Sequence, residues 1–222
     1  MNAIHNWNTW IGTDEAGKGD YFGPLVVAGV YVDAAFLENL SDLGVADGKT
    51  LSNRRIRSIA ESMLSDYEQY IVVVEKMPIE YNSLYDRLRR SGQNLNHLLA
   101  SLHAEAIRTL ANRVDAKHVL VDKFAKDHLI PQQLDRRTSL GMEIRQVTKA
   151  ERDTAVAAAS IIARDAFLKG MDTLSETYEI TLPRGAYQVV EAGKEFVRMH
   201  GTQALEEVAK LHFNLTDAVC AS

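Results

Sequence analysis

Residues 12–24 read Gly-Thr-Asp-Glu-Ala-Gly-Lys-Gly-Asp-Tyr-Phe-Gly-Pro, a stretch that combines two adjacent carboxylates with a glycine-rich basic segment. The apolar run of residues 10–13 predicts a strand that enters the core, and the adjacent carboxylates Asp14 and Glu15 follow it. Successive side chains of a strand point to opposite faces, so these two acids can share one metal site only if the backbone turns there. We therefore predict a turn at Asp14 and Glu15.

A glycine-rich basic segment follows the two acids. Gly17, Gly19 and Gly23 supply the turn, because glycine adopts conformations closed to other residues and lets a ligand lie against backbone N–H groups. Lys18 lies between two of these glycines, where it can hold a phosphate oxygen. The stretch indicates a metal held by carboxylates beside a bound phosphodiester. The alternative is a solvated turn and an ordinary hairpin connection, the usual interpretation of an isolated Gly-x-Gly pattern.

Composition limits the class of protein. With 222 residues, 46% of them hydrophobic, the chain can bury a substantial core, and we expect one domain over residues 1–222. The formal charge of −5 argues against non-specific coating of nucleic acid, so contact with a polyanion requires a local basic patch. The only cysteine, Cys220, excludes an internal disulfide and fits a reducing compartment. The sequence contains no apolar run of membrane-spanning length and no signal segment, so we expect a cytoplasmic protein without a membrane partner.

Hydrophobic patterns along the rest of the chain predict alternating strands and helices. Runs rich in β-branched residues predict strands at 25–32, 69–75, 118–122 and 142–147. Apolar residues at helical spacing predict helices from residue 52 and at 94–110, 149–168 and 203–211. The small side chains of residues 155–163 allow that helix to approach a neighbour closely. This order predicts a mixed α/β fold, with a five-stranded sheet of three antiparallel strands and then parallel additions, flanking helices and a C-terminal helical segment.

Two further acids lie where a site could form. Asp122 ends a predicted strand, where α/β sheets commonly present binding groups, although a carboxylate there can also cap the next turn. Glu151 completes Thr148-Lys149-Ala150-Glu151, which also matches a capping box at a helix N-terminus. Asp153 competes with Glu151 as the fourth acid. We interpret as ordinary core or surface residues the histidines that lack metal-helix spacing: His97, His103, His200 and His212.

Several of these stretches resemble motifs of the type 2 ribonucleases H, and of ribonuclease HIII in particular. Residues 12–24 resemble the first motif, Gly-x-Asp-Glu-Ala-Gly-Arg/Lys-Gly, in its ribonuclease HIII form. Residues 122–125, Asp-Lys-Phe-Ala, resemble the second catalytic motif. Residues 148–151 with the following alanine-rich run resemble the third, with glutamate where ribonuclease HII usually has aspartate. Residues 209–213, Ala-Lys-Leu-His-Phe, extend the resemblance to nearly the whole chain.

The resemblance implies a ribonuclease H-like fold with four catalytic acids that also hold metal: Asp14, Glu15, Asp122 and Glu151. Carboxylates suit Mg²⁺ or Mn²⁺ and disfavour zinc. The implied activity is that of an endonuclease that cuts the RNA strand of RNA–DNA hybrids by a two-metal-ion mechanism and leaves 3′-hydroxyl and 5′-phosphate ends. Backbone groups of the glycine turn would contact ribose 2′-hydroxyls. The implied substrate-binding residues are Gly17, Lys18, Gly19, Lys49, Asn94 and Asn96.

Some features depart from the family pattern. Residues 47–49 have glycine where the family's Asp-Ser-Lys motif has serine, which keeps Lys49 as a phosphate contact and removes the hydroxyl. Asn94 and Asn96 resemble the family's Asn-Leu-Asn, but asparagines before a helix are equally good caps. Ribonuclease HIII usually carries an additional N-terminal domain. Since only 11 residues precede Gly12, we expect a catalytic domain without that extension.

Two other functions are alternatives to hybrid cleavage. The first is ribonuclease HII-like nicking at single ribonucleotides embedded in DNA, against which Lys18, Glu151 and the Asp-Tyr-Phe run at 20–22 argue. The second is a non-catalytic hybrid-binding module, against which the presence of all four acids argues. The expected partner is an RNA–DNA hybrid duplex, with no obligate protein partner.

Overall fold

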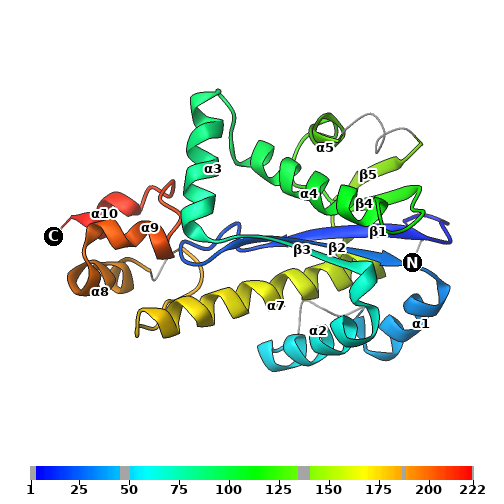
Figure 1. Cartoon of the computed structure of the whole chain (residues 1–222), viewed down its shortest axis with the longest axis horizontal. Coiled ribbons are helices and arrows are strands. Elements are labelled where there is room, and N and C mark those ends of the chain that lie inside the picture. The colour runs from blue at the N-terminus through cyan, green and yellow to red at the C-terminus, as the bar shows by residue number, and fades with distance from the viewer. Residues whose placement is uncertain (1–3, 46–50, 135–140, 187–188, 222) are drawn as a thin grey trace. The chain divides into compact units, whose positions relative to one another are not determined.

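A computed structural model describes residues 4–45, 51–134, 141–186 and 189–221 (Figure 1). The strands are β1 (Trp10–Ala16), β2 (Leu25–Val32), β3 (Ile71–Lys76), β4 (His118–Asp122) and β5 (Glu143–Val147). The longer helices are α1 (Ala34–Asp42), α2 (Asn53–Tyr67), α3 (Pro78–Arg90), α4 (Leu95–Ala111), α7 (Thr154–Thr177) and α8 (Val190–His200). Short helical segments are η2 (Glu68–Tyr70), α5 (Leu129–Gln133), η3 (Ala150–Arg152), η4 (Thr202–Ala204), α9 (Leu205–Val208) and α10 (Thr216–Cys220).

The strands form one mixed sheet in the order β3-β2-β1-β4-β5. β1 pairs in parallel with β4, with Ile11 opposite Val119, and β4 pairs in parallel with β5, with Asp122 opposite Val147. β2 is buried along its whole length because helices cover both faces of the sheet. The predicted fold class is confirmed, including its antiparallel and parallel pairs. The predicted C-terminal helix at 203–211 is wrong in detail, since η4 and α9 end at Val208 and a further helix, α10, follows.

The chain divides into two compact units. The first comprises Met1–Glu15, Val27–Val74 and Leu95–Asp165. The second comprises Ala16–Val26, Glu75–Asn94 and Ala166–Ser222. All four predicted catalytic acids belong to the first unit, and the glycine turn and the C-terminal segment belong to the second.

Within the first unit, β1 has a different helix on each of its faces (Figure 1). Thr13 points toward α4, because its Oγ1 lies 2.9 Å from the Nδ1 of His103 on that helix. Gly12 points the other way, since a Cβ atom there would lie 2.3 Å from the carbonyl carbon of Ala155 in the first turn of α7. Because side chains alternate along a strand, the even-numbered residues of β1 face α7 and the odd-numbered residues face α4. The predicted close approach of the alanine-rich helix is found here.

Replacing Gly12 by alanine is expected to destabilise the fold by about 1–3 kcal/mol or more, because the methyl group has to displace helix backbone rather than a flexible side chain. Chemical denaturation would measure the loss. Gly19→Ala is the control, since a Cβ atom at Gly19 meets nothing within 4 Å. Equal stability of the Gly12→Ala protein and the wild type would contradict the packing described.

Candidate active site

Asp14 and Glu15 both lie within β1, so the predicted turn at these two acids is wrong: the strand continues to Ala16. Their side chains consequently follow the alternation of the strand. Asp14 accepts a hydrogen bond from the side chain of Ser160 on α7, whereas Glu15 Oε2 lies 3.3 Å from His103 Nε2 on α4. Asp14 Oδ1 also accepts from the backbone N–H of Glu15 at 2.8 Å. The two acids are therefore held at the end of β1 by partners from opposite faces of the sheet.

Asp122 joins this strand end from the neighbouring parallel strand. It is the last residue of β4, which pairs with β1, and its Oδ1 accepts a 2.8 Å hydrogen bond from the backbone N–H of Ala150. Ala150 is followed in η3 by Glu151, which is half-buried. One hydrogen bond thus connects the Asp122 carboxylate to the short turn that carries Glu151.

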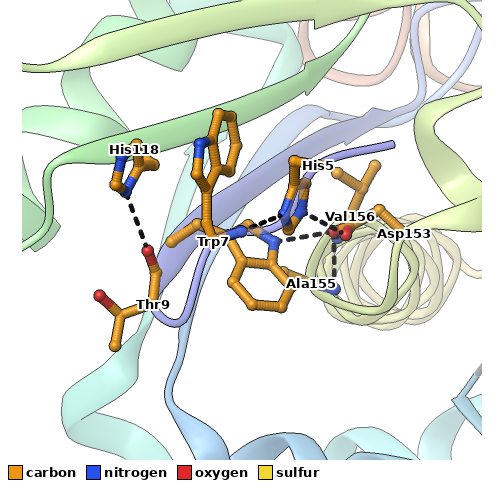
Figure 2. Close-up of polar contacts among 8 residues, drawn as sticks. His5, Trp7, Thr9, His118, Asp153, Ala155 and Val156 are labelled. Carbon is orange, nitrogen blue, oxygen red and sulfur yellow. Dashed lines mark hydrogen bonds and ion pairs between the residues drawn. The ribbon is translucent and has the colours of Figure 1, made fainter. Parts of the chain in front are cut away.

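Asp153, the competing fourth acid, has structural partners (Figure 2). Its Oδ1 accepts from the backbone N–H groups of Ala155 and Val156, at 3.0 and 3.2 Å, which makes it the N-cap of α7. The same oxygen accepts from Trp10 Nε1 at 2.9 Å, and Oδ2 lies 3.0 Å from His5 Nε2. The capping-box interpretation of Glu151 is therefore wrong, because α7 begins at Thr154 and Asp153 caps it.

The environment of Asp14 disfavours its charged form. Burial, followed by the negative charges of Glu15 and Asp122, raises the pKa of Asp14 to about 7, although hydrogen bonds from Ser160 and the Glu15 N–H act in the opposite direction. The negative charges of Glu15 and Asp122 thus both oppose ionisation of Asp14. A cation among them would relieve that repulsion.

In the second unit, the glycine turn begins directly after β1. Gly17 has a left-handed φ of +84°, and a Cβ atom there would lie 2.1 Å from the carbonyl oxygen of Pro24, so the position requires glycine. Asp20 closes the turn by donating its N–H to Gly17 O at 3.3 Å. The Asp20 carboxylate accepts from the N–H of Gly185 at 2.7 Å. The turn is thus fixed at both its entry and its exit.

Lys210 holds the segment that leaves this turn. Its side chain is fully buried, and Nζ donates to the carbonyl oxygens of Gly23 and Phe22, at 2.6 and 3.3 Å. The Lys210 N–H donates to Tyr21 O at 2.8 Å, and Ala209 forms an isolated antiparallel bridge with Phe22. The C-terminal segment therefore stabilises the backbone that follows the glycine turn.

Lys210→Met is expected to destabilise the protein by about 1–3 kcal/mol, because it keeps the length of the side chain but leaves two buried carbonyl groups without their donor.

Burial lowers the pKa of Lys210 to about 7, so between pH 7 and about 10 the unfolded chain keeps a proton that the folded chain has lost. Wild-type stability should therefore gain from Lys210 as pH rises through this range, and Lys210→Met should lack that gain. Denaturation at several pH values tests both points. The exposed Lys194→Met is the control, and a similar loss there would contradict the role of Lys210.

The chain is similar in sequence and in structure to known ribonucleases H. The ribonuclease HII family model matches residues 11–216. The ribonuclease HIII of Protochlamydia amoebophila is 42% identical over 94% of this chain and 67% of its own length, and that of Chlamydia muridarum is 40% identical over 96% and 70%. The crystal structure of Bst-RNase HIII in complex with Mn²⁺ superposes with a TM-score of 0.82 at 35% identity, over 96% of this chain and 69% of that one.

The chain belongs to the ribonuclease HIII family. The predicted resemblance is thereby confirmed, and the chain spans about two thirds of the length of these relatives. As a ribonuclease HIII family member, it is a metal-dependent ribonuclease H by class.

The acids that the ribonuclease HIII resemblance selects fit a divalent cation by their chemistry. In the part of the chain that the structure describes, no three His, Cys, Asp or Glu side chains already converge closely enough to hold a metal ion. The donors are nevertheless all carboxylate oxygens, which Mg²⁺ and Mn²⁺ prefer. The pKa of Asp14, raised first by burial and then by the negative charges of Glu15 and Asp122, is also consistent with a cation site. Asp14 and Asp122 lie on the paired strands β1 and β4, and Glu151 lies in η3, which is bonded to Asp122 through Ala150.

The remaining predicted site residues are those expected to contact the substrate. Lys49 lies outside the described residues. Asn94 directly precedes α4 and Asn96 lies in its first turn, a placement that suits both a cap and a substrate contact. Lys18 is half-buried within the glycine turn. None of the helices among the described residues is long and apolar enough to cross a membrane.

One residue of the site was not foreseen. His103 was interpreted as ordinary, yet both of its ring nitrogens contact β1, at Thr13 and Glu15. The signal available in the sequence is its position: His103 lies four residues after Leu99 and four before Ile107, both buried. A polar side chain inside the apolar stripe of a helix requires a buried partner.

Proposed function

We propose that the protein is an endonuclease that hydrolyses the RNA strand of RNA–DNA hybrids, with Mg²⁺ or Mn²⁺, and leaves 3′-hydroxyl and 5′-phosphate ends. One observation carries the proposal: Asp14, Glu15 and Asp122 lie together at the ends of the paired strands β1 and β4, in a chain of the ribonuclease HIII family. The Mn²⁺ complex of Bst-RNase HIII supports the use of a divalent cation.

The four acids, Asp14, Glu15, Asp122 and Glu151, would hold the metal. When bound, two divalent cations would supply activation of the attacking water and stabilisation of the departing oxygen of the phosphodiester. Asp14 accepts a hydrogen bond from Ser160, and burial and the charges of Glu15 and Asp122 raise its pKa, so its carboxyl group would have to lose a proton for a cation to bind. Asp122 keeps the turn that carries Glu151 next to the end of β4 through its bond to Ala150. These carboxylates position the ion; none is required as the nucleophile.

Substrate contacts are proposed for the residues that follow the acids in the chain. The backbone of Gly17, Lys18 and Gly19 would contact ribose 2′-hydroxyls, the group by which a protein distinguishes RNA from DNA. The fixed entry and exit of this turn support such a role, because a rigid backbone presents its N–H groups in one arrangement. Lys49, Asn94 and Asn96 are proposed to contact the backbone of the hybrid.

A second candidate activity is nicking at single ribonucleotides embedded in DNA, because the family model that matches carries the name ribonuclease HII. The similarity to ribonuclease HIII proteins supports cleavage of continuous hybrids as the first proposal. We further propose that residues 1–222 act as one catalytic domain without an obligate protein partner. A cytoplasmic location is also proposed, and the presence of a single cysteine in the sequence supports it.

Cleavage of two duplexes distinguishes these functions. One is an all-RNA strand paired with DNA and the other a DNA duplex with one embedded ribonucleotide, each incubated with Mg²⁺, Mn²⁺ or chelator. We expect metal-dependent cleavage of the first, and Asp122→Asn serves as the inactive control. Cleavage of the second duplex alone would establish the nicking activity instead. Binding of the hybrid without cleavage in either metal would indicate a non-catalytic module.

A further inference from the structure

His103 lies fully buried on α4 and contacts two residues of β1 at once. Its Nδ1 lies 2.9 Å from Thr13 Oγ1, and its Nε2 lies 3.3 Å from Glu15 Oε2. Thr13 and Glu15 are two residues apart in a strand, so they point to the same face and one imidazole can bridge them. The His103 side chain has no solvent exposure and that of Glu15 is 12% exposed, so water competes little for either group.

For a neutral imidazole, the chemistry of the three groups selects one arrangement of hydrogens. An ionised carboxylate only accepts, so His103 Nε2 carries the proton that it donates to Glu15. In the neutral ring Nδ1 is then an acceptor, and the Thr13 hydroxyl donates to it. Thr13 thereby fixes the tautomer that Glu15 requires.

The imidazole also contacts the Asp122 side of the site. Its ring stacks on that of Phe124, with centroids 4.8 Å apart and planes 18° from parallel. Phe124 lies two residues after Asp122, so the His103 side chain contacts Glu15 itself and the segment that follows Asp122. Packing on one face and hydrogen bonds at both nitrogens leave the ring a single orientation.

We propose that His103 is a positioning residue for the Glu15 carboxylate, and that Thr13 and Phe124 fix its tautomer and plane. The inference rests on the proposed function, because it assigns Glu15 as a metal-holding acid. A long glutamate side chain at a strand end has several rotamers, and the bond from His103 restricts them before a metal binds. Partners of this kind, behind a metal ligand, typically contribute about 10–100-fold to metal affinity or activity.

The test is the affinity of the full chain for Mn²⁺, measured by calorimetry, together with cleavage of an RNA–DNA hybrid as a function of Mn²⁺ concentration. His103→Leu is expected to weaken Mn²⁺ binding about 10–100-fold, and saturating Mn²⁺ should restore most of the cleavage. His103→Gln keeps an N–H donor near Nε2 and should recover part of the affinity. Thr13→Val leaves the imidazole in place but removes the donor to Nδ1, so a smaller loss is expected, and this variant serves if His103→Leu does not fold.

His118→Leu is the matched control, because it removes a half-buried imidazole that contacts Thr9 and Trp7 instead of a predicted metal-holding acid. It should leave Mn²⁺ affinity unchanged. A purely structural role of His103 would lower the unfolding temperature without changing the affinity of the folded protein. Folded His103→Leu and Thr13→Val proteins with wild-type Mn²⁺ affinity would overturn the inference. If the wild type binds Mn²⁺ in a way that depends on His103 but does not cleave the hybrid, the role of His103 is upheld. Only the proposed function is then overturned.

Discussion

Asp14→Asn is expected to abolish hybrid cleavage and, at the same time, to make the metal-free protein more stable above pH 7. The loss of activity should be at least about 1,000-fold, since a ligand charge that supports several kcal/mol of transition-state stabilisation is removed. The stability gain follows from the raised pKa of Asp14, because the folded protein binds this proton more tightly than the unfolded chain does. As pH rises through about 7, the folded protein loses that proton and must accommodate a third negative charge beside Glu15 and Asp122.

The stability gain has a defined pH window. Below about pH 4 the carboxyl group of Asp14 is protonated in both states, so wild type and Asp14→Asn should be equally stable. The difference in unfolding free energy between the two proteins should develop between pH 4 and 7 and remain above pH 7. We expect it to reach on the order of 2 kcal/mol. This is about half of what the full pKa difference implies, because solvent screens a side chain that is only partly buried. Denaturation in chelator at several pH values measures it. The exposed Glu105→Gln on α4 is the control. A stability loss in Asp14→Asn would argue against a repelling cluster.

Glu151 and Asp153 are expected to respond to substitution in opposite ways. Glu151→Gln should reduce turnover at least about 100-fold with little change in stability, because a neutral amide cannot replace a charged metal ligand. Asp153→Ala should cost on the order of 2–3 kcal/mol, because it removes the N-cap of α7 and leaves the buried Trp10 N–H without its acceptor.

Asp153→Asn separates the two roles further, because asparagine keeps an oxygen that can cap α7 but carries no charge. This variant should retain turnover. Denaturation and single-turnover cleavage on the same preparations measure both properties. Retained turnover in Glu151→Gln together with its loss in Asp153→Asn would transfer the metal-holding role to Asp153.

The strands and the two central helices could be predicted because their patterns are local. β2 is a continuous β-branched run, and α4 repeats apolar residues every three or four positions. Among the longer helices of the described residues, α1, α3 and α8 were not predicted. α3 begins at Pro78, and a proline directly after a strand is compatible both with a loop and with the first turn of a helix. α1 is short and starts directly after β2, where Asp33 caps it by accepting from the Phe36 N–H.

The identity of the acids could be predicted, but their orientation could not. The motif pattern selects Asp14 and Glu15, whereas their partners Ser160 and His103 lie far away in sequence, and only the sheet brings them to β1. The expected turn at the two acids assumed that both carboxylates must point the same way. In the structure, pairing of β1 with β4 keeps the strand extended, and the helices on its two faces hold one acid each.

The position of a bound metal tests the central claim most directly. Crystals of the protein grown with Mn²⁺ would locate the ion by its anomalous scattering. We expect density within about 2.1 Å of carboxylate oxygens at the ends of β1 and β4, with ligands drawn from Asp14, Glu15, Asp122 and Glu151 and with Asp153 still bonded to α7. Mn²⁺ bound at Asp153, or bound only at sites remote from Asp14 and Asp122, would contradict the four-acid site.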